Sequence, residues 1–175
     1  RDPGVCEVYS PPRITDTANK SGLSHGWALD LTTVGADGVR WDFDLPECRE
    51  NAKTLVRKHR PLLLVLDPMC TWFSKLQNIN RDRIDPKTWE GNLQRAVCHL
   101  GFALELAELQ MQGGRQFLFE HPDSADSWKH PIMLDFVCRH PVLYTSTFDM
   151  CQYGLRLTDQ DGIRRFAKKP TQILT

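Results

Sequence analysis

The residue best placed in this sequence to do covalent chemistry is Cys70. It follows an uninterrupted apolar run at residues 61–66, and Asp67-Pro68 forms a turn signal between the two. A short Leu/Val run that ends in a turn is typical of a strand buried inside a parallel sheet. In open α/β sheets the residues beyond the carboxyl end of such a strand line the ligand crevice. We therefore expect Cys70 to lie at a ligand site, where a thiolate can act as a nucleophile.

Acidic residues stand at the ends of three other expected strands. Glu120 follows the apolar segment 116–119, and we interpret Glu120-His121-Pro122 as the turn that breaks this strand. Asp30 closes a second strand, where an acid suits ribose hydroxyls. Asp42 and Asp44 flank Phe43, and because side chains alternate along a strand only one of them can face the crevice. We favour Asp42.

Alternating strands and helices are needed to position these residues. The helix at 86–111 has the clearest signal, since its apolar residues recur at helical spacing and it ends at two glycines. The expected strands are 5–10, 26–32, 39–44, 61–66, 116–119, 142–148 and 169–175, and the other helices are 13–21, 46–58 and 132–138. This alternation predicts an α/β fold, a single doubly wound, mostly parallel sheet with helices on both faces.

Composition limits the classes of protein to consider. With 175 residues, 41% of them hydrophobic and 25% charged, we expect one globular domain over residues 1–175. No apolar run approaches the roughly 18 residues that span a bilayer. Lys and Arg number 22, as do Asp and Glu, so nucleic acid binding would need a local basic patch.

The six cysteines contain no C-x-x-C pair, which argues against zinc. In a chain with an ample core we expect reduced thiols and an intracellular, reducing compartment. The first residue is Arg1 rather than Met, so we also expect a piece of a longer polypeptide.

Three segments, in this order, resemble the DNA (cytosine-5) methyltransferase family. Residues 68–74 (PMCTWFS) are similar to the Pro-Cys-Gln nucleophile loop with its nearby Phe-Ser. Residues 119–121 (FEH) stand in the place of Glu-Asn-Val, and residues 149–154 (DMCQYG) are similar to the Tyr-Gly segment before the last catalytic-domain strand. The chain is also similar to methyltransferase-like segments of retroelement polyproteins.

This resemblance implies a Rossmann-like methyltransferase fold and methylation of cytosine C5 in DNA or RNA. Cys70 would add to C6 of a flipped-out base, a role that requires a partly exposed cysteine whose surroundings favour the thiolate. Glu120 would stabilise the adduct near N3 and the exocyclic amine. S-adenosylmethionine would lie across the first strand ends. The implied cofactor-binding residues are Ser10, Asp30, Asp42 and Pro68, and the implied nucleic-acid contacts are Arg165, Lys168 and Lys169.

Two alternatives stay open because the chain departs from the family pattern. The first loop, residues 10–13 (SPPR), lacks the family's glycines, Met69 replaces a proline, and the chain has no room for a separate target-recognition domain. The first alternative, which these departures favour, is a catalytically degenerate methyltransferase-fold subunit that binds a protein partner in a larger assembly. Alternatively, residues 67–70 are a variant of the Asp-Pro-Pro-Tyr loop of amino-methyltransferases, in which Asp67 acts on an exocyclic amine.

Overall fold

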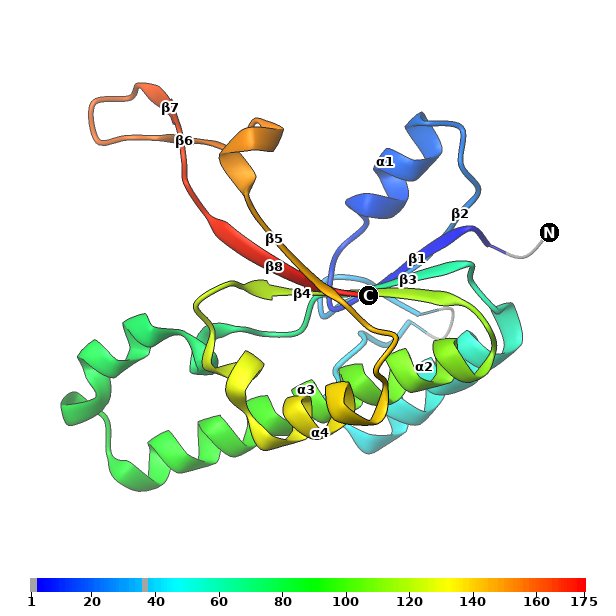
Figure 1. The fold of residues 1–175 in the computed structure, drawn as a ribbon, viewed down its shortest axis with the longest axis horizontal. Coiled ribbons are helices and arrows are strands. Elements are labelled where there is room, and N and C mark those ends of the chain that lie inside the picture. The colour runs from blue at the N-terminus through cyan, green and yellow to red at the C-terminus, as the bar shows by residue number, and fades with distance from the viewer. Residues whose placement is uncertain (1–2, 36–37) are drawn as a thin grey trace.

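The computed structural model describes residues 3–35 and 38–175, and its centre is a six-stranded mixed sheet (Figure 1). In their order across the sheet, the strands are β2 (His25–Leu29), β1 (Val5–Val8), β3 (Leu63–Leu66), β4 (Gln116–Pro122), β8 (Pro170–Leu174) and β5 (Thr145–Asp149). The first four strands are parallel, whereas β8 is antiparallel to both of its neighbours. The predicted α/β sheet is confirmed, but it is mixed, because β8 returns against β4 and β5.

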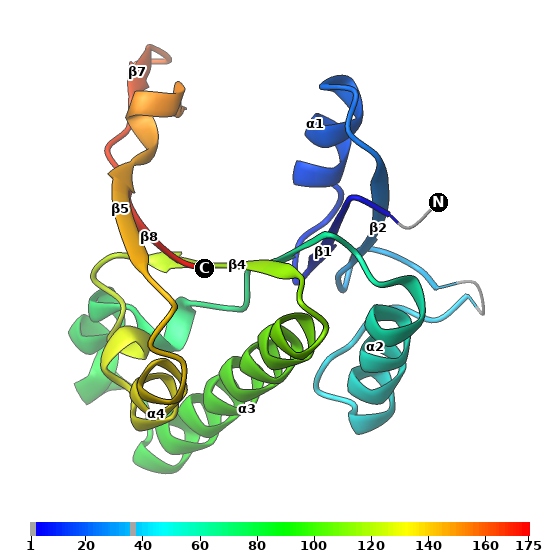
Figure 2. The same ribbon diagram turned by 45° about the vertical axis from the view of Figure 1, so that its right-hand side comes forward.

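Helices cover both faces of the sheet, but unequally (Figure 2). One face carries α1 (Ile14–Lys20), and the other carries α2 (Pro46–His59), α3 (Pro86–Gln112) and α4 (Pro131–Arg139). Alternation along β1 explains the division. Val5 packs with Ala18 of α1, whereas Cys6 and Val8 belong to the larger core on the opposite face.

The larger core forms where α3 crosses the sheet. Leu64 and Phe117 on neighbouring strands pack against the inner face of α3, where Leu100 and Leu106 are fully buried. The helix begins at Pro86, after Asp85 accepts a hydrogen bond from the Thr88 amide at 2.9 Å. The predicted helices at 46–58, 86–111 and 132–138 are confirmed to within two residues at each end.

The start of α1 is fixed by a buried carboxylate on β1. Glu7 Oε1 accepts hydrogen bonds from the backbone amides of Arg13 at 3.0 Å and Thr15 at 2.7 Å. Its other oxygen is buried without a hydrogen-bond partner. Because amides at a helix start lack partners within the helix, Glu7 satisfies donors that would otherwise be buried and unpaired.

One predicted strand is absent, and another was predicted to end too early. Residues 39–44 form a loop with one isolated bridge, Val34 to Arg40, instead of a strand, because the Asp42 carboxylate accepts the Asp44 amide and turns the chain. The β4 strand is not broken at Glu120 but continues to Pro122. Beyond Phe119 it pairs only with β8, so one edge is open and a proline without an N–H is tolerated.

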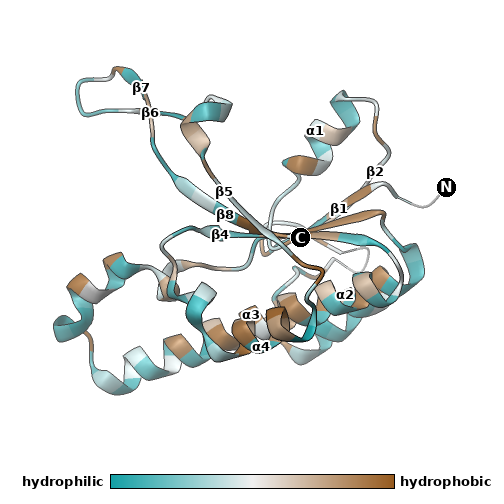
Figure 3. Cartoon of the chain, in the orientation of Figure 1, coloured by the Kyte–Doolittle hydropathy of each residue, from teal (hydrophilic) through white to brown (hydrophobic). Residues whose placement is uncertain are grey.

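The segment between β5 and β8 forms a hairpin that the sequence did not predict. Its strands are β6 (Arg156–Thr158) and β7 (Arg164–Phe166), which form a separate two-stranded sheet. The Asp159 carboxylate accepts the amides of Asp161 and Ile163 and so fixes the turn. Figure 3 shows this hairpin as mostly hydrophilic, in contrast to the hydrophobic central strands. No helix in the described part of the chain is long and apolar enough to cross a membrane.

Candidate functional site

The structure places Cys70 and Glu120 at one edge of the sheet. Leu66 of β3 pairs in parallel with Phe119 of β4, so the next residues, Asp67 and Glu120, lie side by side. Cys70 lies in the turn that leads from β3 into the 3-10 helix η1 (Thr71–Phe73). The negative charge of Glu120 is one of the causes that raise the pKa of the Cys70 thiol. The two residues that the sequence pairs are thus brought together across adjacent strand ends.

The surroundings of Cys70 favour the thiol rather than the thiolate. Cys70 is half-buried, and burial, followed by the negative charge of Glu120, raises the pKa of its thiol. Asp67 adds to this effect, and Lys169 opposes it. This is the reverse of the thiolate-favouring environment that a nucleophilic cysteine requires.

Asp67 and Glu120 form a close pair of carboxyl groups. Burial, with the hydrogen bond and the charge of Glu120, raises the pKa of Asp67 to about 7. Lys169 Nζ lies 3.5 Å from Glu120 Oε1, and the Glu120 side chain is 19% exposed. Arg13 supplies a second positive charge to Asp67. We call Asp67, Cys70, Glu120 and Lys169 the carboxyl–thiol cluster.

His121 holds the Cys70 loop on β4, a role that was not predicted from the sequence. Its ring is fully buried, and burial lowers its pKa to about 4, so it is neutral near pH 7. Nε2 donates to the Pro68 carbonyl at 3.0 Å, and Nδ1 accepts from the Ser127 hydroxyl at 2.7 Å. The sequence signal was the alternation of Phe117, Phe119 and His121, which places all three on the core face.

A cavity of about 160 Å³ opens beside the cluster, at the carboxyl ends of β1, β2 and β3. Asp30 and Asp42, both predicted to bind a cofactor, line it. Ser10 and Pro68 are not among the lining residues. The Ser10 hydroxyl is buried and donates to the Pro11 carbonyl at 2.9 Å. The full lining is Tyr9, Asp30, Leu31, Trp41, Asp42, Phe43, Asp67, Met69, Arg95 and His99.

A chain of hydrogen bonds forms one wall of this cavity. The Tyr9 hydroxyl donates to His99 Nδ1 at 2.9 Å, and His99 Nε2 donates to Asp44 Oδ1 at 3.0 Å. Arg95 Nε also donates to Asp44, at 2.6 Å, and this is the largest cause of the lowered pKa of that carboxyl. Burial lowers the pKa of His99, which favours the neutral ring that this arrangement needs. Asp44 therefore positions the wall, and Asp42 lines the cavity itself.

Tyr9 shows how a first loop without glycine takes its shape. Its φ is 72°, in the left-handed region that costs a non-glycine residue about 1–2 kcal/mol. The ring packs against Phe43 at a centroid distance of 4.8 Å and against Phe102 at 6.1 Å, while the hydroxyl bonds to His99. These contacts hold the strained backbone in place, so the loop keeps a glycine-like conformation with an aromatic side chain.

The three predicted nucleic-acid contacts each have a different ion-pair partner. Arg165 pairs with Asp159 inside the hairpin at 2.6 Å, and Lys168 lies 3.7 Å from Asp149. Lys169 alone of the three predicted contacts reaches the carboxyl–thiol cluster. The prediction therefore joins residues with different partners, and Lys169 is the one that the structure connects to the candidate site.

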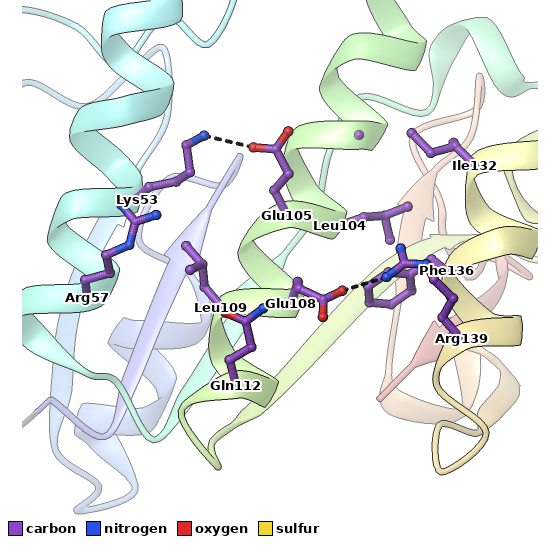
Figure 4. Close-up of a pocket in the computed structure, with 11 residues that line it drawn as sticks. Lys53, Arg57, Leu104, Glu105, Glu108, Leu109, Gln112, Ile132, Phe136 and Arg139 are labelled. Atoms are coloured by element: carbon purple, nitrogen blue, oxygen red, sulfur yellow. Dashed lines mark hydrogen bonds and ion pairs between the residues drawn. The ribbon is translucent and has the colours of Figure 1, made fainter.

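A separate groove lies on the outer side of α3, between α2 and α4 (Figure 4). Its volume is about 340 Å³, and none of the predicted site residues lines it. Lys53 pairs with Glu105 at 2.9 Å and Arg139 with Glu108 at 3.2 Å, so ion pairs join α3 to both neighbouring helices. Four of the charged side chains of this groove are therefore engaged in helix packing.

Within residues 3–35 and 38–175, no three or more His, Cys, Asp or Glu residues are grouped so that they could hold a metal ion. All six cysteines are unpaired. No protein-family model and no curated protein sequence matches the chain. The class that the structure itself defines is an α/β protein with a six-stranded mixed sheet and a carboxyl–thiol cluster at the ends of β3 and β4.

Proposed function

We propose that this chain is a Rossmann-like methyltransferase that methylates cytosine C5 in nucleic acid, with S-adenosylmethionine as the methyl donor. The observation that carries the proposal is the meeting of Cys70 and Glu120 at adjacent strand ends, beside a cavity lined by Asp30 and Asp42. Addition to a pyrimidine ring requires a nucleophile and a carboxyl group held close together, and here the turn after β3 carries the thiol and β4 carries the carboxyl group.

In this mechanism Cys70 Sγ adds to C6 of the base, which must leave a duplex to reach it. The S–C6 bond forms, and the C5=C6 electron pair becomes available at C5. Glu120 contacts N3 and the exocyclic amine, where it stabilises the adduct. When bound, S-adenosylmethionine supplies an electrophilic methyl group. Lys169, beside Glu120, contributes positive charge at the mouth of the site.

The cavity residues suit the adenosine part of this cofactor. Asp30 and Asp42 offer carboxylates for ribose hydroxyls, and Trp41 offers an aromatic face. The cavity of about 160 Å³ is smaller than the roughly 300 Å³ at the low end for small-molecule sites, so it must open to admit the cofactor. We expect Asp30→Asn and Asp42→Asn each to weaken binding about tenfold in calorimetry. Asp16→Asn, on the exposed side of α1, is the matched control.

The decisive experiment is covalent trapping on nucleic acid that contains 5-fluorocytosine. In the presence of S-adenosylmethionine the fluorine at C5 blocks the elimination that would release Cys70, so a stable protein–nucleic acid adduct accumulates. We expect the adduct with the wild type, none with Cys70→Ser, and full adduct with Cys98→Ser, whose thiol is exposed on α3. An adduct that survives in Cys70→Ser would refute the role of this thiol.

A second candidate function is that of a catalytically degenerate subunit that binds a protein partner. The small cavity and the raised pKa of Cys70 favour it. It predicts no heat of binding for S-adenosylmethionine and no methylated product. Product analysis also tests the third reading, because Asp67 acting on an exocyclic amine would give N4-methylcytosine instead of 5-methylcytosine. Tight cofactor binding would remove the support for a degenerate subunit.

A further inference from the structure

We infer that Asp67 and Glu120 act as one proton-sharing pair, which accepts the proton that Cys70 must lose and supplies the proton that N3 of the base must gain. The inference rests on the proposed function for its substrate. It assigns Asp67 a positioning role of its own, because Asp67 acts on the base through Glu120.

The geometry that supports the pair follows from the strand register. Because Leu66 pairs with Phe119, Asp67 and Glu120 leave their strands side by side and on the same face of the sheet. The interaction with Glu120 is, after burial, the main cause of the raised pKa of Asp67. Two carboxylates at such a separation repel strongly, and one shared proton turns the repulsion into a hydrogen bond.

The positive charges near Asp67 and Glu120 suit a pair that carries one negative charge in total. Lys169, which precedes β8, lies 3.5 Å from Glu120, and Arg13, which precedes α1, acts on Asp67. Cys70 is the remaining titratable group of the cluster and is neutral as a thiol. A pair that holds one proton is balanced by the adjacent lysine, whereas a doubly ionised pair would place a second charge in a largely buried site.

The titration of the site agrees with this arrangement. Burial and the proximity of Glu120 raise the pKa of Asp67 to about 7, so the pair holds the shared proton at pH values below about 7. Burial and the charge of Glu120 raise the pKa of Cys70, so its thiol keeps its proton until the substrate arrives. With these two shifts, the pair carries one proton and the Cys70 thiol carries another before the transfer begins.

The transfer balances in atoms and electrons. The S–H bond of Cys70 breaks and its proton goes to the ionised oxygen of the pair, while Sγ uses its electron pair to form the bond to C6. The C5=C6 electron pair moves into the C4–C5 bond, and the C4=N3 electron pair takes a proton at N3 from Glu120, which has gained the Cys70 proton, while Asp67 keeps the proton that it shares with Glu120. Asp67 and Glu120 together begin and end the step with one proton, so their net charge does not change.

Carboxyl titration in the cofactor-free protein tests the shared proton directly. In protein labelled with 13C at the carboxyl groups of Asp and Glu, we expect one NMR resonance to titrate near pH 7 and to disappear in Asp67→Asn. In Glu120→Gln we expect the midpoint of that resonance to fall by at least one pH unit. Glu105→Gln, on the exposed side of α3, should leave it in place. Titration of both carboxyl groups below pH 5 would overturn the inference.

Alkylation of Cys70 by iodoacetamide gives a second readout, measured without cofactor in protein whose Cys98, Cys138 and Cys151 are serines. Removing a negative charge beside the thiol lowers its pKa, so at pH 8 we expect alkylation to be several-fold faster in Glu120→Gln. A smaller increase is expected in Asp67→Asn. A residue with only a packing role would leave this rate unchanged, and unchanged rates in both variants would overturn the inference.

The two proposals fail separately. If trapping fails but the carboxyl group titrates near pH 7, the pair stands and the substrate assignment falls. If trapping depends on Cys70 but the carboxyl groups titrate below pH 5, the methyltransferase proposal stands and Glu120 acts without Asp67.

Discussion

Replacing Asp67 with Asn should stabilise the protein at neutral and alkaline pH. An amide has nearly the shape of a protonated carboxyl group, and it can still donate a hydrogen bond to Glu120. The folded protein holds a proton on Asp67 up to about pH 7, whereas the ordinary pKa of this side chain is 3.8. In the wild type, therefore, the carboxyl group reduces stability as the pH rises from about 4 to about 7, and the loss is complete above pH 7.

The size of this effect follows from the shift in pKa. Three pH units at about 1.4 kcal/mol each set an upper bound of about 4 kcal/mol on the change in the free energy of unfolding that the substitution can cause. Partial exposure of Asp67 and the charge of Lys169 reduce the value, so we expect a gain of about 2–3 kcal/mol for Asp67→Asn at pH 8. At pH 4 the variant and the wild type should be about equally stable.

Urea unfolding at several pH values between 4 and 9 measures this gain. The difference between the variant and the wild type at each pH is the informative quantity, because His121 changes stability in the opposite direction over part of the same range. Asp16→Asn, on α1, is the exposed control and should follow the wild type. An Asp67→Asn curve parallel to that of the wild type from pH 4 to pH 8 would refute the shared proton and the burial argument together.

The remaining predictions concern the anchor of the Cys70 loop and the packing of β1 against β2. Because burial lowers the pKa of His121 to about 4, its stabilisation should be complete above about pH 6.5 and should be lost as the pH falls toward 4, by up to about 3 kcal/mol. His121→Leu should flatten this acid transition in urea unfolding and cost about 2–3 kcal/mol at pH 7, since it leaves a buried carbonyl and a hydroxyl unpaired. Retention of the acid transition in this variant would contradict the assignment. Gly26→Ala should cost about 1–3 kcal/mol, because the new Cβ would collide with the sulfur of Cys6. Gly91→Ala, in α3 with open space around it, should instead gain about 0.5–1 kcal/mol, and equal effects at the two positions would refute the packing argument.

Local patterns in the sequence were enough to predict most elements. Apolar spacing and terminal glycines located α3, and proline at a helix start located α2. The same reasoning failed at residues 39–44, where a polar turn overrides the short β-prone run. It also ended β4 too early at Glu120, because pairing with β8, about 50 residues away, extends that strand.

Cys70 and Glu120 could be selected from the sequence because each follows an apolar run, and the carboxyl ends of parallel strands meet at one edge of a sheet. The partnership of Asp67 with Glu120 and the anchoring of Pro68 by His121 were decided by the tertiary structure alone. Strand register sets which side chains adjoin, and packing sets how much water reaches them. Both depend on residues about 50 positions apart in the chain, so the ionisation states of Asp67, Cys70 and His121 belong to the folded protein and not to any local pattern.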